Sequence, residues 1–519
     1  MKKKRELIYF FFLFIFSVCI NQYYGSIGVF PIDTFLFYDT GFRTLNGYLP
    51  TRDFWINSGF LIDIIQALFF KIFGVSWFSY VFHASVFNFL IAAATFFTFK
   101  KFNLNIHLTI FYSLLVSILA YPISGTPFLD HHSMILSLIA LFCFILSLKG
   151  ESIWFWFFTP IFLWLGFLSK QTPAAYISLI ILIISIIYFL FNFNFKKILF
   201  FLSGGVSIIL ITFLLLLIFN IEFNSFFEQI FLFPLTIGGD RIQNFLFPIE
   251  FNRIILRFKL IHISQAILII VIAKKIYENF RYIKNAEFYI LISIILASFS
   301  LIFHQLLTLN QKFIFFIIPM LLGFSNIYYN KYFKKNIFVI FFLVFLGASS
   351  TIYYKFTYLD NRKFMELENV DLKKTVKANI IDNKLNYLNW INPVFQGSPD
   401  NEIKLLKESI EIINNDSRKK ILATHYQFIA SLLNDNVFSP NRTYSGNGIS
   451  YPLIENQNFI IYKKFFLNQI IKNEIKIIYT LKPISDYIFL NILEKKCVKT
   501  NKINEILFVH DISACKFKY

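Results

Sequence analysis

The chain has 519 residues, of which 57% are hydrophobic and 15% are charged, and its formal net charge is +19. A soluble protein of this length would carry about 25% charged residues, so the composition indicates a membrane protein whose apolar residues lie in spans of about 20 residues. Lys and Arg in cytoplasmic loops commonly cause such a positive charge, and we expect no nucleic-acid partner.

The N-terminus predicts an uncleaved first span that starts in the cytoplasm. Basic residues at positions 2–5 precede an apolar run, which continues into Gln22 without a small-residue cleavage site. About eleven apolar runs of near-spanning length follow one another along the chain. They lie at about 7–20, 77–97, 108–123, 134–148, 153–168, 175–193, 198–219, 254–273, 288–303, 313–329 and 337–354.

The flanking charges orient these runs. Every second turn carries Lys or Arg, which places that side in the cytoplasm by the positive-inside rule. The turns with unusual polar residues then fall together on the outer face: 25–76, 130–132, 169–171, 239–241 and 304–312. Polar groups at a membrane edge are costly unless they face water or a cavity. Their gathering on one side favours a functional site over ordinary loop solvation.

The first outer loop, residues 25–76, is the richest of these turns. Residues 33–46 and 59–73 are predicted to be helical, and the second stretch is typical of an amphipathic helix lying in the membrane interface. Asp39 and Arg43 are spaced to form a local ion pair. Asp33 precedes a helical stretch, where it is either a helix cap or a catalytic carboxylate.

The composition becomes more polar from about residue 359. Residues 359–519 predict a small α/β domain outside the cytoplasm, with a strand feeding a helix in RKKILATHYQFIASLL, further strands in EIKIIYTL and EILFVH, and a helix in EIKLLKESIEIINN. Cys497 and Cys515 flank the last strand and form a disulfide candidate if the domain faces an oxidising compartment. Cys19 and Cys143 are interpreted as small core residues.

Glycosyl transfer from a polyprenyl-phosphate sugar suits such an outer face. It needs an apolar groove for the lipid, cations for the leaving phosphate and a carboxylate base for the acceptor hydroxyl. The candidates are Asp33 or Asp39 as the base, Lys170, Arg241 and Lys312 for the donor phosphate, His304 as a polar contact, and Asp53 and Asp130 for sugar hydroxyls or a metal. His131 and His132 are further candidate ligands, so a divalent metal is possible, but no cofactor follows from the spacing.

The opening stretch FPIDTFLFYDTGFRTLNGYLPTRDFWINSGFLIDIIQALFFKIFG resembles the first outer loop of GT-C glycosyltransferases, in the branch of protein O-mannosyltransferases and lipid A aminoarabinose transferases (family 39-like). In that family an acidic residue soon after the first span is the catalytic base, and this position falls on Asp33. FLDHHSMILSLIALFCFIL with Asp130, GFLSKQT with Lys170 and QKFIFFIIPML with Lys312 are similar to later motifs. Thr34 departs from a paired acid often found there.

We therefore expect a polytopic α-helical membrane protein with a GT-C-like transmembrane domain at 1–358 and an extracytoplasmic α/β domain at 359–519. The resemblance implies an inverting transferase that moves a sugar from a polyprenyl-phosphate donor to a lipid, glycan or protein acceptor. The expected location is the bacterial inner membrane, with the site on the outer face. The alternatives are a lipid-linked polysaccharide polymerase or ligase, a transporter or flippase without chemistry, and a scaffold for the C-terminal domain.

Overall fold

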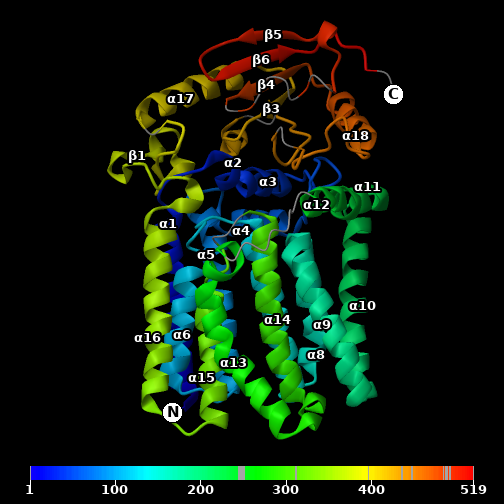
Figure 1. The fold of residues 1–519 in the computed structure, drawn as a ribbon. Coiled ribbons are helices and arrows are strands. Elements are labelled where there is room, and N and C mark those ends of the chain that lie inside the picture. The colour runs from blue at the N-terminus through cyan, green and yellow to red at the C-terminus, as the bar shows by residue number, and fades with distance from the viewer. Residues whose placement is uncertain are drawn as a thin grey trace. The chain divides into compact units, whose positions relative to one another are not determined.

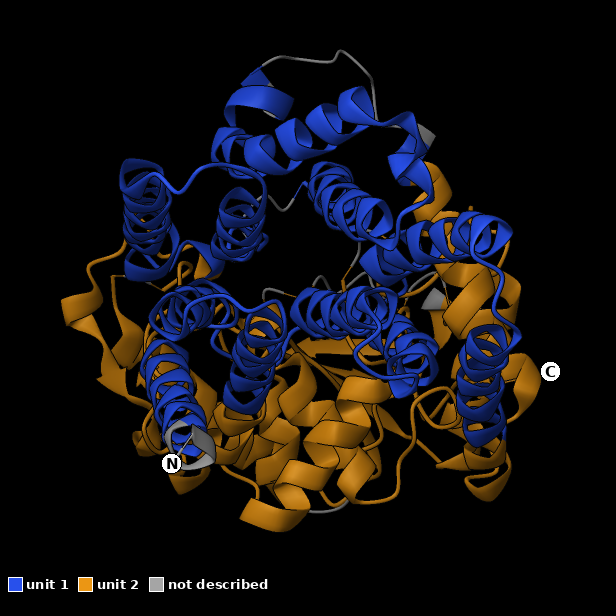
Figure 2. Cartoon of the chain, turned by 90° about the horizontal axis from the view of Figure 1, so that it is seen from below, with its two compact units in different colours: residues 1–25, 84–213, 241–364 blue, residues 26–83, 214–240, 365–519 orange. Residues whose placement is uncertain are grey.

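A computed structural model describes residues 2–243, 252–309, 313–395, 397–433, 437–445, 448–482, 484, 489 and 492–517. The chain divides into two compact units, which Figure 2 colours separately. The helical unit comprises residues 1–25, 84–213 and 241–364, and the mixed unit comprises residues 26–83, 214–240 and 365–519. Each unit is thus assembled from segments that are far apart in the sequence.

Long apolar helices form the helical unit, and Figure 2 looks along many of them. They are α1 (Lys2–Gly25), α5 (Trp77–Lys101), α6 (Ile106–Leu119), α7 (Leu129–Lys149), α8 (Trp154–Ser169), α9 (Gln171–Phe191), α10 (Phe195–Ile218), α13 (Lys259–Glu278), α14 (Ala286–Leu307), α15 (Ile317–Tyr332) and α16 (Ile337–Tyr354). α5 and α10 continue into the mixed unit. Each apolar run predicted from the sequence coincides with one of these helices.

Membrane-spanning length is a stricter criterion than helicity. Within the described part of the chain, eight helices are long and apolar enough to cross a membrane: α1, α5, α7, α9, α10, α13, α14, and α16 with its continuation to Met365. α6 and α8 are apolar but shorter. The chain is therefore mostly helical with multiple candidate spans.

Helix α7 lies at the core of the helical unit. Its sequence is apolar on all sides apart from its first turn, which is the pattern of a buried helix, and nearly all of its side chains are buried. It packs against α8, α9 and α14. A Cβ added at Gly166 of α8 would lie 2.9 Å from Ser137 Oγ of α7, so a glycine allows these two backbones to approach closely.

A four-stranded sheet organises the C-terminal part of the mixed unit (Figure 1). Its order is β3 (Lys420–Ala423), β4 (Ile477–Leu481), β6 (Leu507–Asp511) and β5 (Lys499–Lys502), with β3 and β4 parallel and the other pairs antiparallel. The same unit contains the helices α17 (Pro399–Asn415) and α18 (Phe459–Lys472). It also contains a two-stranded antiparallel sheet of β1 (Val376–Lys377) and β2 (Asn389–Trp390).

The sheet confirms the strands predicted near residues 420, 478 and 508, and α17 confirms the predicted helix. The helix predicted directly after the first strand is wrong in type: residues Gln427–Leu432 form a short 3-10 helix. Burial does not alternate along the two parallel strands: all four residues of β3 and all five of β4 are buried. Such strands are read from continuous apolar runs rather than from alternation.

Residues 25–76, predicted as an outer loop, contain three helices of the mixed unit: α2 (Pro31–Thr34), α3 (Leu36–Leu45) and α4 (Leu61–Phe73). α4 has the burial pattern expected of an interfacial helix. Asp63 and Gln66 are completely buried, whereas Leu68, Ile72 and Phe73 are exposed. An outward apolar face with a buried polar face suits contact with lipid rather than with water.

The same loop is joined to the C-terminal segment by backbone hydrogen bonds. Val29 N donates to Ile391 O (2.9 Å), Trp55 N donates to Pro440 O (2.7 Å), and Arg442 N donates to Trp55 O (2.9 Å). Residues 26–83 therefore belong to one compact unit with residues 365–519.

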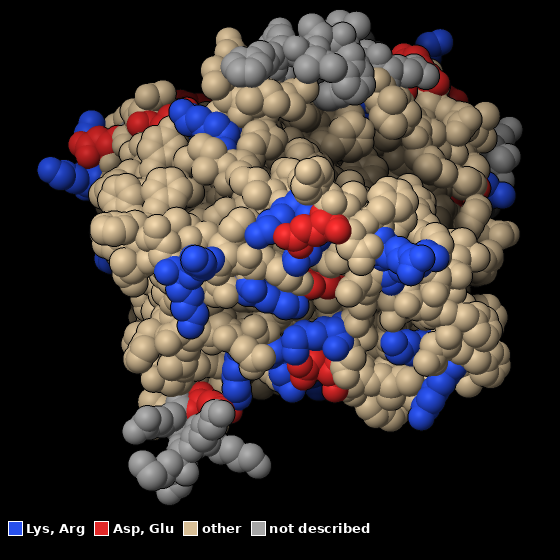
Figure 3. Space-filling model, turned by 60° about the horizontal axis from the view of Figure 1, so that its bottom comes forward, with Lys and Arg blue, Asp and Glu red and all other residues tan. Residues whose placement is uncertain are grey.

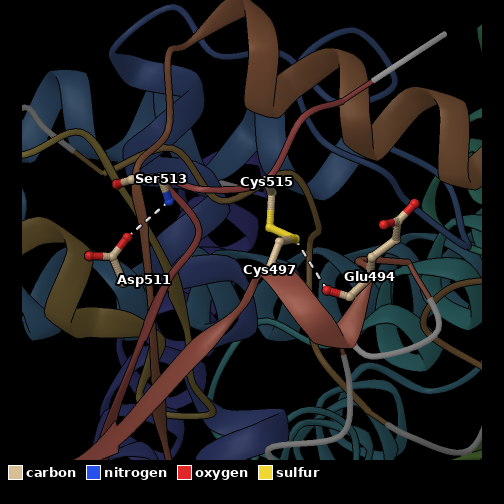
Figure 4. The surroundings of a disulfide bond; sticks show 5 residues. All are labelled: Glu494, Cys497, Asp511, Ser513 and Cys515. Atoms are coloured by element: carbon tan, nitrogen blue, oxygen red, sulfur yellow. Dashed lines mark hydrogen bonds between the residues drawn. A yellow bond between two sulfur atoms is a disulfide. The ribbon is translucent and has the colours of Figure 1, made fainter.

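Cys497 and Cys515 are joined by a disulfide in the mixed unit (Figure 4). Their Cα atoms lie 4.9 Å apart. The bond links the short 3-10 helix Lys495–Cys497, which precedes β5, to the segment that follows β6. The disulfide suggested by the sequence is therefore present, and it joins residues on either side of the final antiparallel strands.

Candidate functional site

A buried carboxylate with two basic partners lies at one end of the helical unit. Asp130 is in the first turn of α7, Lys170 lies between α8 and α9, and His304 is in the last turn of α14. Lys170 Nζ lies 2.7 Å from Asp130 Oδ2, and His304 Nε2 lies 2.7 Å from Asp130 Oδ1. Both carboxylate oxygens thus have a nitrogen donor.

The break between α8 and α9 positions Lys170. The residue is extended between the two helices, its N–H donates to Gly166 O, and its carbonyl accepts a bond from Ser133 Oγ at 2.9 Å. Ser133 lies one turn after Asp130 on α7. The backbone of Lys170 is therefore fixed against α7, and the side chain meets Asp130.

Lys170 and Arg241 carry two positive charges against the single carboxylate of Asp130, and the cluster is open on one side. Asp130 and His304 are buried, but the Lys170 side chain keeps 18% of its surface exposed. Arg241, in the last turn of α12 (Phe233–Gln243), is near enough for its charge to act on His304. A buried carboxylate is tolerated because it is paired, and the surplus cations leave a place that suits an anion.

The histidines beside Asp130 pack with aromatic residues. His132 Nδ1 lies 2.6 Å from Tyr121 OH, and the His131 ring stacks on Tyr121 with centroids 4.7 Å apart. Phe313 packs edge-on against His131. Among the described residues, no group of three or more His, Cys, Asp or Glu side chains could hold a metal ion. These contacts give His131 and His132 a packing role.

Asp33 is in the first turn of α2 in the mixed unit and is half-buried. The turn around it is well held: Thr34 Oγ1 accepts the Phe30 N–H at 2.9 Å, and Thr34 O accepts the Tyr80 OH at 2.6 Å. The backbone at Asp33 is therefore held in place, and the Asp33 residue is partly exposed to solvent.

Asp39, another acidic residue of the loop, forms a local ion pair. Asp39 pairs with Arg43 at 2.7 Å, which confirms the predicted local pair, and Arg43 also donates to Ser439 O and Asn441 O. Burial raises the pKa of the Asp39 carboxyl, and the Arg43 charge opposes that rise.

Asp53 was predicted to contact substrate, and the structure gives it three partners within the mixed unit. Its Oδ2 atom accepts the Leu49 N–H at 2.9 Å and lies 2.7 Å from Arg52 Nη2, while its Oδ1 atom lies 3.2 Å from Lys472 Nζ. The Asp53 carboxylate thus stabilises the turn that begins at Leu49 and forms an ion pair with the last residue of α18. Of the other predicted residues, Lys312 lies outside the described part of the chain.

Sequence reasoning missed two buried polar groups of the mixed unit. Asp63 of α4 pairs with Arg442. Glu402 of α17 accepts hydrogen bonds from Trp390 Nε1 (2.8 Å), Tyr426 OH (2.8 Å) and Asn392 Nδ2. Burial raises the pKa of Glu402 to about 7. The signal for Asp63 was an acid within an apolar helix, whereas no local pattern marked Glu402.

No family model and no curated protein matches the chain. Solved structures of the oligosaccharyltransferase of the archaeon Archaeoglobus fulgidus are similar at low level. One, in complex with Zn and sulfate, has 13% identity and a TM-score of 0.42 over 91% of this chain and 68% of that one. A second, tethered to an acceptor peptide with the NVT sequon, has 12% identity and a TM-score of 0.40 over 91% and 69%.

A third, in complex with an inhibitory peptide and a dolichol-phosphate, has 11% identity and a TM-score of 0.39 over 92% of this chain and 70% of that one. These scores are too low for the likeness to carry an argument about fold or function. The argument for function therefore stands on the residues of this chain.

Proposed function

We propose that the protein is a membrane glycosyltransferase that moves a sugar from a polyprenyl-phosphate donor to an acceptor hydroxyl. The observation that carries this proposal is the buried Asp130 with Lys170 and His304 on its two oxygens. A partly open ammonium held by a buried carboxylate is suited to a phosphate, whose charge grows as it leaves.

Lys170 and Arg241 stabilise the leaving phosphate in this proposal, with Lys312 as a further cation. Asp130 does not touch the donor. It holds Lys170 and His304 in place, so that these side chains need little reorganisation during the reaction. The surplus of positive charge over the single carboxylate supports this division of roles.

Asp33 is the general base of the proposed reaction. The acceptor oxygen attacks the anomeric carbon, the bond from that carbon to the phosphate oxygen breaks with inversion, and the acceptor proton passes to Asp33. The phosphate leaves with its bridging oxygen and both bonding electrons. A half-buried carboxylate on the fixed α2 turn suits this task.

We place this reaction at the outer face of a bacterial inner membrane, with the N-terminus in the cytoplasm. The Lys-bearing ends of α5, α7 and α13 support this orientation. The Cys497–Cys515 disulfide fits an oxidising compartment for residues 359–519.

The test is Asp33→Asn in the full-length protein, with cell-surface glycans and lipids analysed by mass spectrometry. We expect loss of the transferred sugar, while the amount of protein in the membrane stays unchanged. Asp400→Asn is the matched control, because Asp400 is an exposed acid in the first turn of α17. An active Asp33→Asn protein would overturn the assignment of the base.

A further inference from the structure

A second basic pocket lies in the helical unit at the turn between α13 and α14, away from the residues of the proposed reaction. It has a volume of about 320 Å³, and its lining includes Lys275, Glu278, Arg281, Tyr282, Glu287 and Tyr332. Figure 3 brings this end of the molecule forward and shows Lys and Arg side chains gathered around a few acidic ones on an otherwise uncharged surface.

The two carboxylates of this pocket are already paired. Glu278 lies 2.8 Å from Lys275 Nζ and 3.8 Å from Lys274 Nζ. Glu287 lies 2.6 Å from Lys331 Nζ and accepts the Tyr332 hydroxyl. The acidic groups are therefore neutralised by neighbours and do not repel an anion strongly.

Cations remain in surplus after this pairing. Arg281 lines the pocket, is exposed, and makes no ion pair or side-chain hydrogen bond within the part of the chain that the structure describes. Lys284, three residues later, packs over the ring of Phe191. A guanidinium with all of its donors available is suited to the oxygens of a phosphate group, and the Lys275 ammonium, which pairs with Glu278, lines the same pocket.

The surroundings of the pocket indicate a lipid rather than a free ion. Tyr277 and Phe280 flank the lining residues and are 94% and 71% exposed. Aromatic rings so exposed are costly in water but are favoured at the boundary between lipid headgroups and acyl chains. Ile269 and Ile270, two turns earlier on α13, are also exposed. The pocket thus opens where a headgroup would lie.

We propose that this pocket binds the phosphate of an anionic phospholipid headgroup, through Arg281 and Lys275. The hydroxyls of Tyr282 and Tyr332 line the same space. Basic residues at a membrane surface each strengthen binding to anionic lipid several-fold, so the two together account for about a twentyfold preference over a neutral lipid. This site is independent of the proposed transferase reaction.

The test compares the full-length protein with Lys275→Ala/Arg281→Ala, each purified in detergent and mixed with phosphatidylglycerol or phosphatidylcholine. Native mass spectrometry counts the bound lipids. We expect the wild type to retain phosphatidylglycerol about twentyfold better than the double variant, and both proteins to retain phosphatidylcholine equally weakly. Lys196→Ala/Lys335→Ala is the matched control, because these exposed lysines do not line the pocket.

Three outcomes would overturn the proposal. The double variant could retain as much phosphatidylglycerol as the wild type, or the control variant could lose as much as the double variant. Inorganic phosphate could also displace the lipid completely at low millimolar concentration, which would make the pocket a site for free phosphate. Equal thermal unfolding temperatures of the variants exclude misfolding as the cause.

Discussion

Arg442 Nη2 lies 2.5 Å from Asp63 Oδ2, and both side chains are shut off from solvent. The same guanidinium donates to Ser58 Oγ (2.6 Å) and Gly59 O (2.9 Å), so it holds the start of α4. Burial raises the pKa of the Asp63 carboxyl, and the Arg442 charge opposes that rise. Within the mixed unit, this pair joins α4 to a segment 379 residues later.

Arg442→Met should destabilise the protein by about 3–5 kcal/mol, because it leaves the Asp63 carboxyl buried without a cation. The double variant Asp63→Leu/Arg442→Met should lose much less, since no charge is left unpaired. Thermal unfolding of the full-length protein in detergent measures both. Lys419→Ala is the control: it breaks an exposed pair with Glu474 at 2.7 Å and should cost less than about 1 kcal/mol. An Arg442→Met protein as stable as Lys419→Ala would contradict the role of the pair.

The positions of the helices were predictable because a membrane imposes a strong local signal. A run of about 20 apolar residues must satisfy its backbone internally, so it forms a helix wherever it occurs. The strands β3, β4 and β6 were predictable for a similar reason, since each contains a short apolar run. Both signals lie within the segment itself and need no knowledge of its partners.

Partners across the chain were not predictable from these patterns. Asp63 is an acid within the apolar sequence of α4, but nothing local points to Arg442. Lys170 and Asp130 were both candidates, yet the sequence assigned them to phosphate and to sugar or metal, while the structure pairs them. A buried charge needs a partner, and which residue supplies it depends on how the helices pack.

Lys170→Met should lower transferase activity by about 10²–10³-fold, because one charge that stabilises the leaving phosphate is lost. Asp130→Asn should also lower activity, through Lys170 and His304, and Asp130→Glu should restore part of it. Sugar transfer in membranes, normalised to protein amount, measures these effects. Lys197→Met, at the start of α10, is the control and should leave activity unchanged. A fully active Lys170→Met protein would contradict the phosphate contact.

Cys497→Ser/Cys515→Ser should lower the free energy of unfolding by about 3 kcal/mol, because the disulfide closes a loop across a sequence separation of 18. Cys19→Ser, which removes a free cysteine, should have no such effect. Thermal unfolding with and without reductant measures the loss. Reductant should destabilise the wild type and Cys19→Ser, but not Cys497→Ser/Cys515→Ser. Alkylation of the unfolded, unreduced wild type should label Cys19 and Cys143 only; labelling of Cys497 would show that the bond is absent.

Glu402→Gln should change how the stability of the mixed unit depends on pH. Burial raises the pKa of Glu402 to about 7 from its ordinary value of 4.5. Between these values the folded protein holds a proton that the unfolded chain has released, so the contribution of Glu402 to stability falls as pH rises through this window. The stability of wild type relative to Glu402→Gln should therefore drop by about 3 kcal/mol from about pH 4.5 to about pH 7. Unfolding midpoints of both proteins across that range measure it. Glu408→Gln, at an exposed position of the same helix, should give a difference that does not vary with pH, and a flat difference for Glu402→Gln would refute the proton uptake.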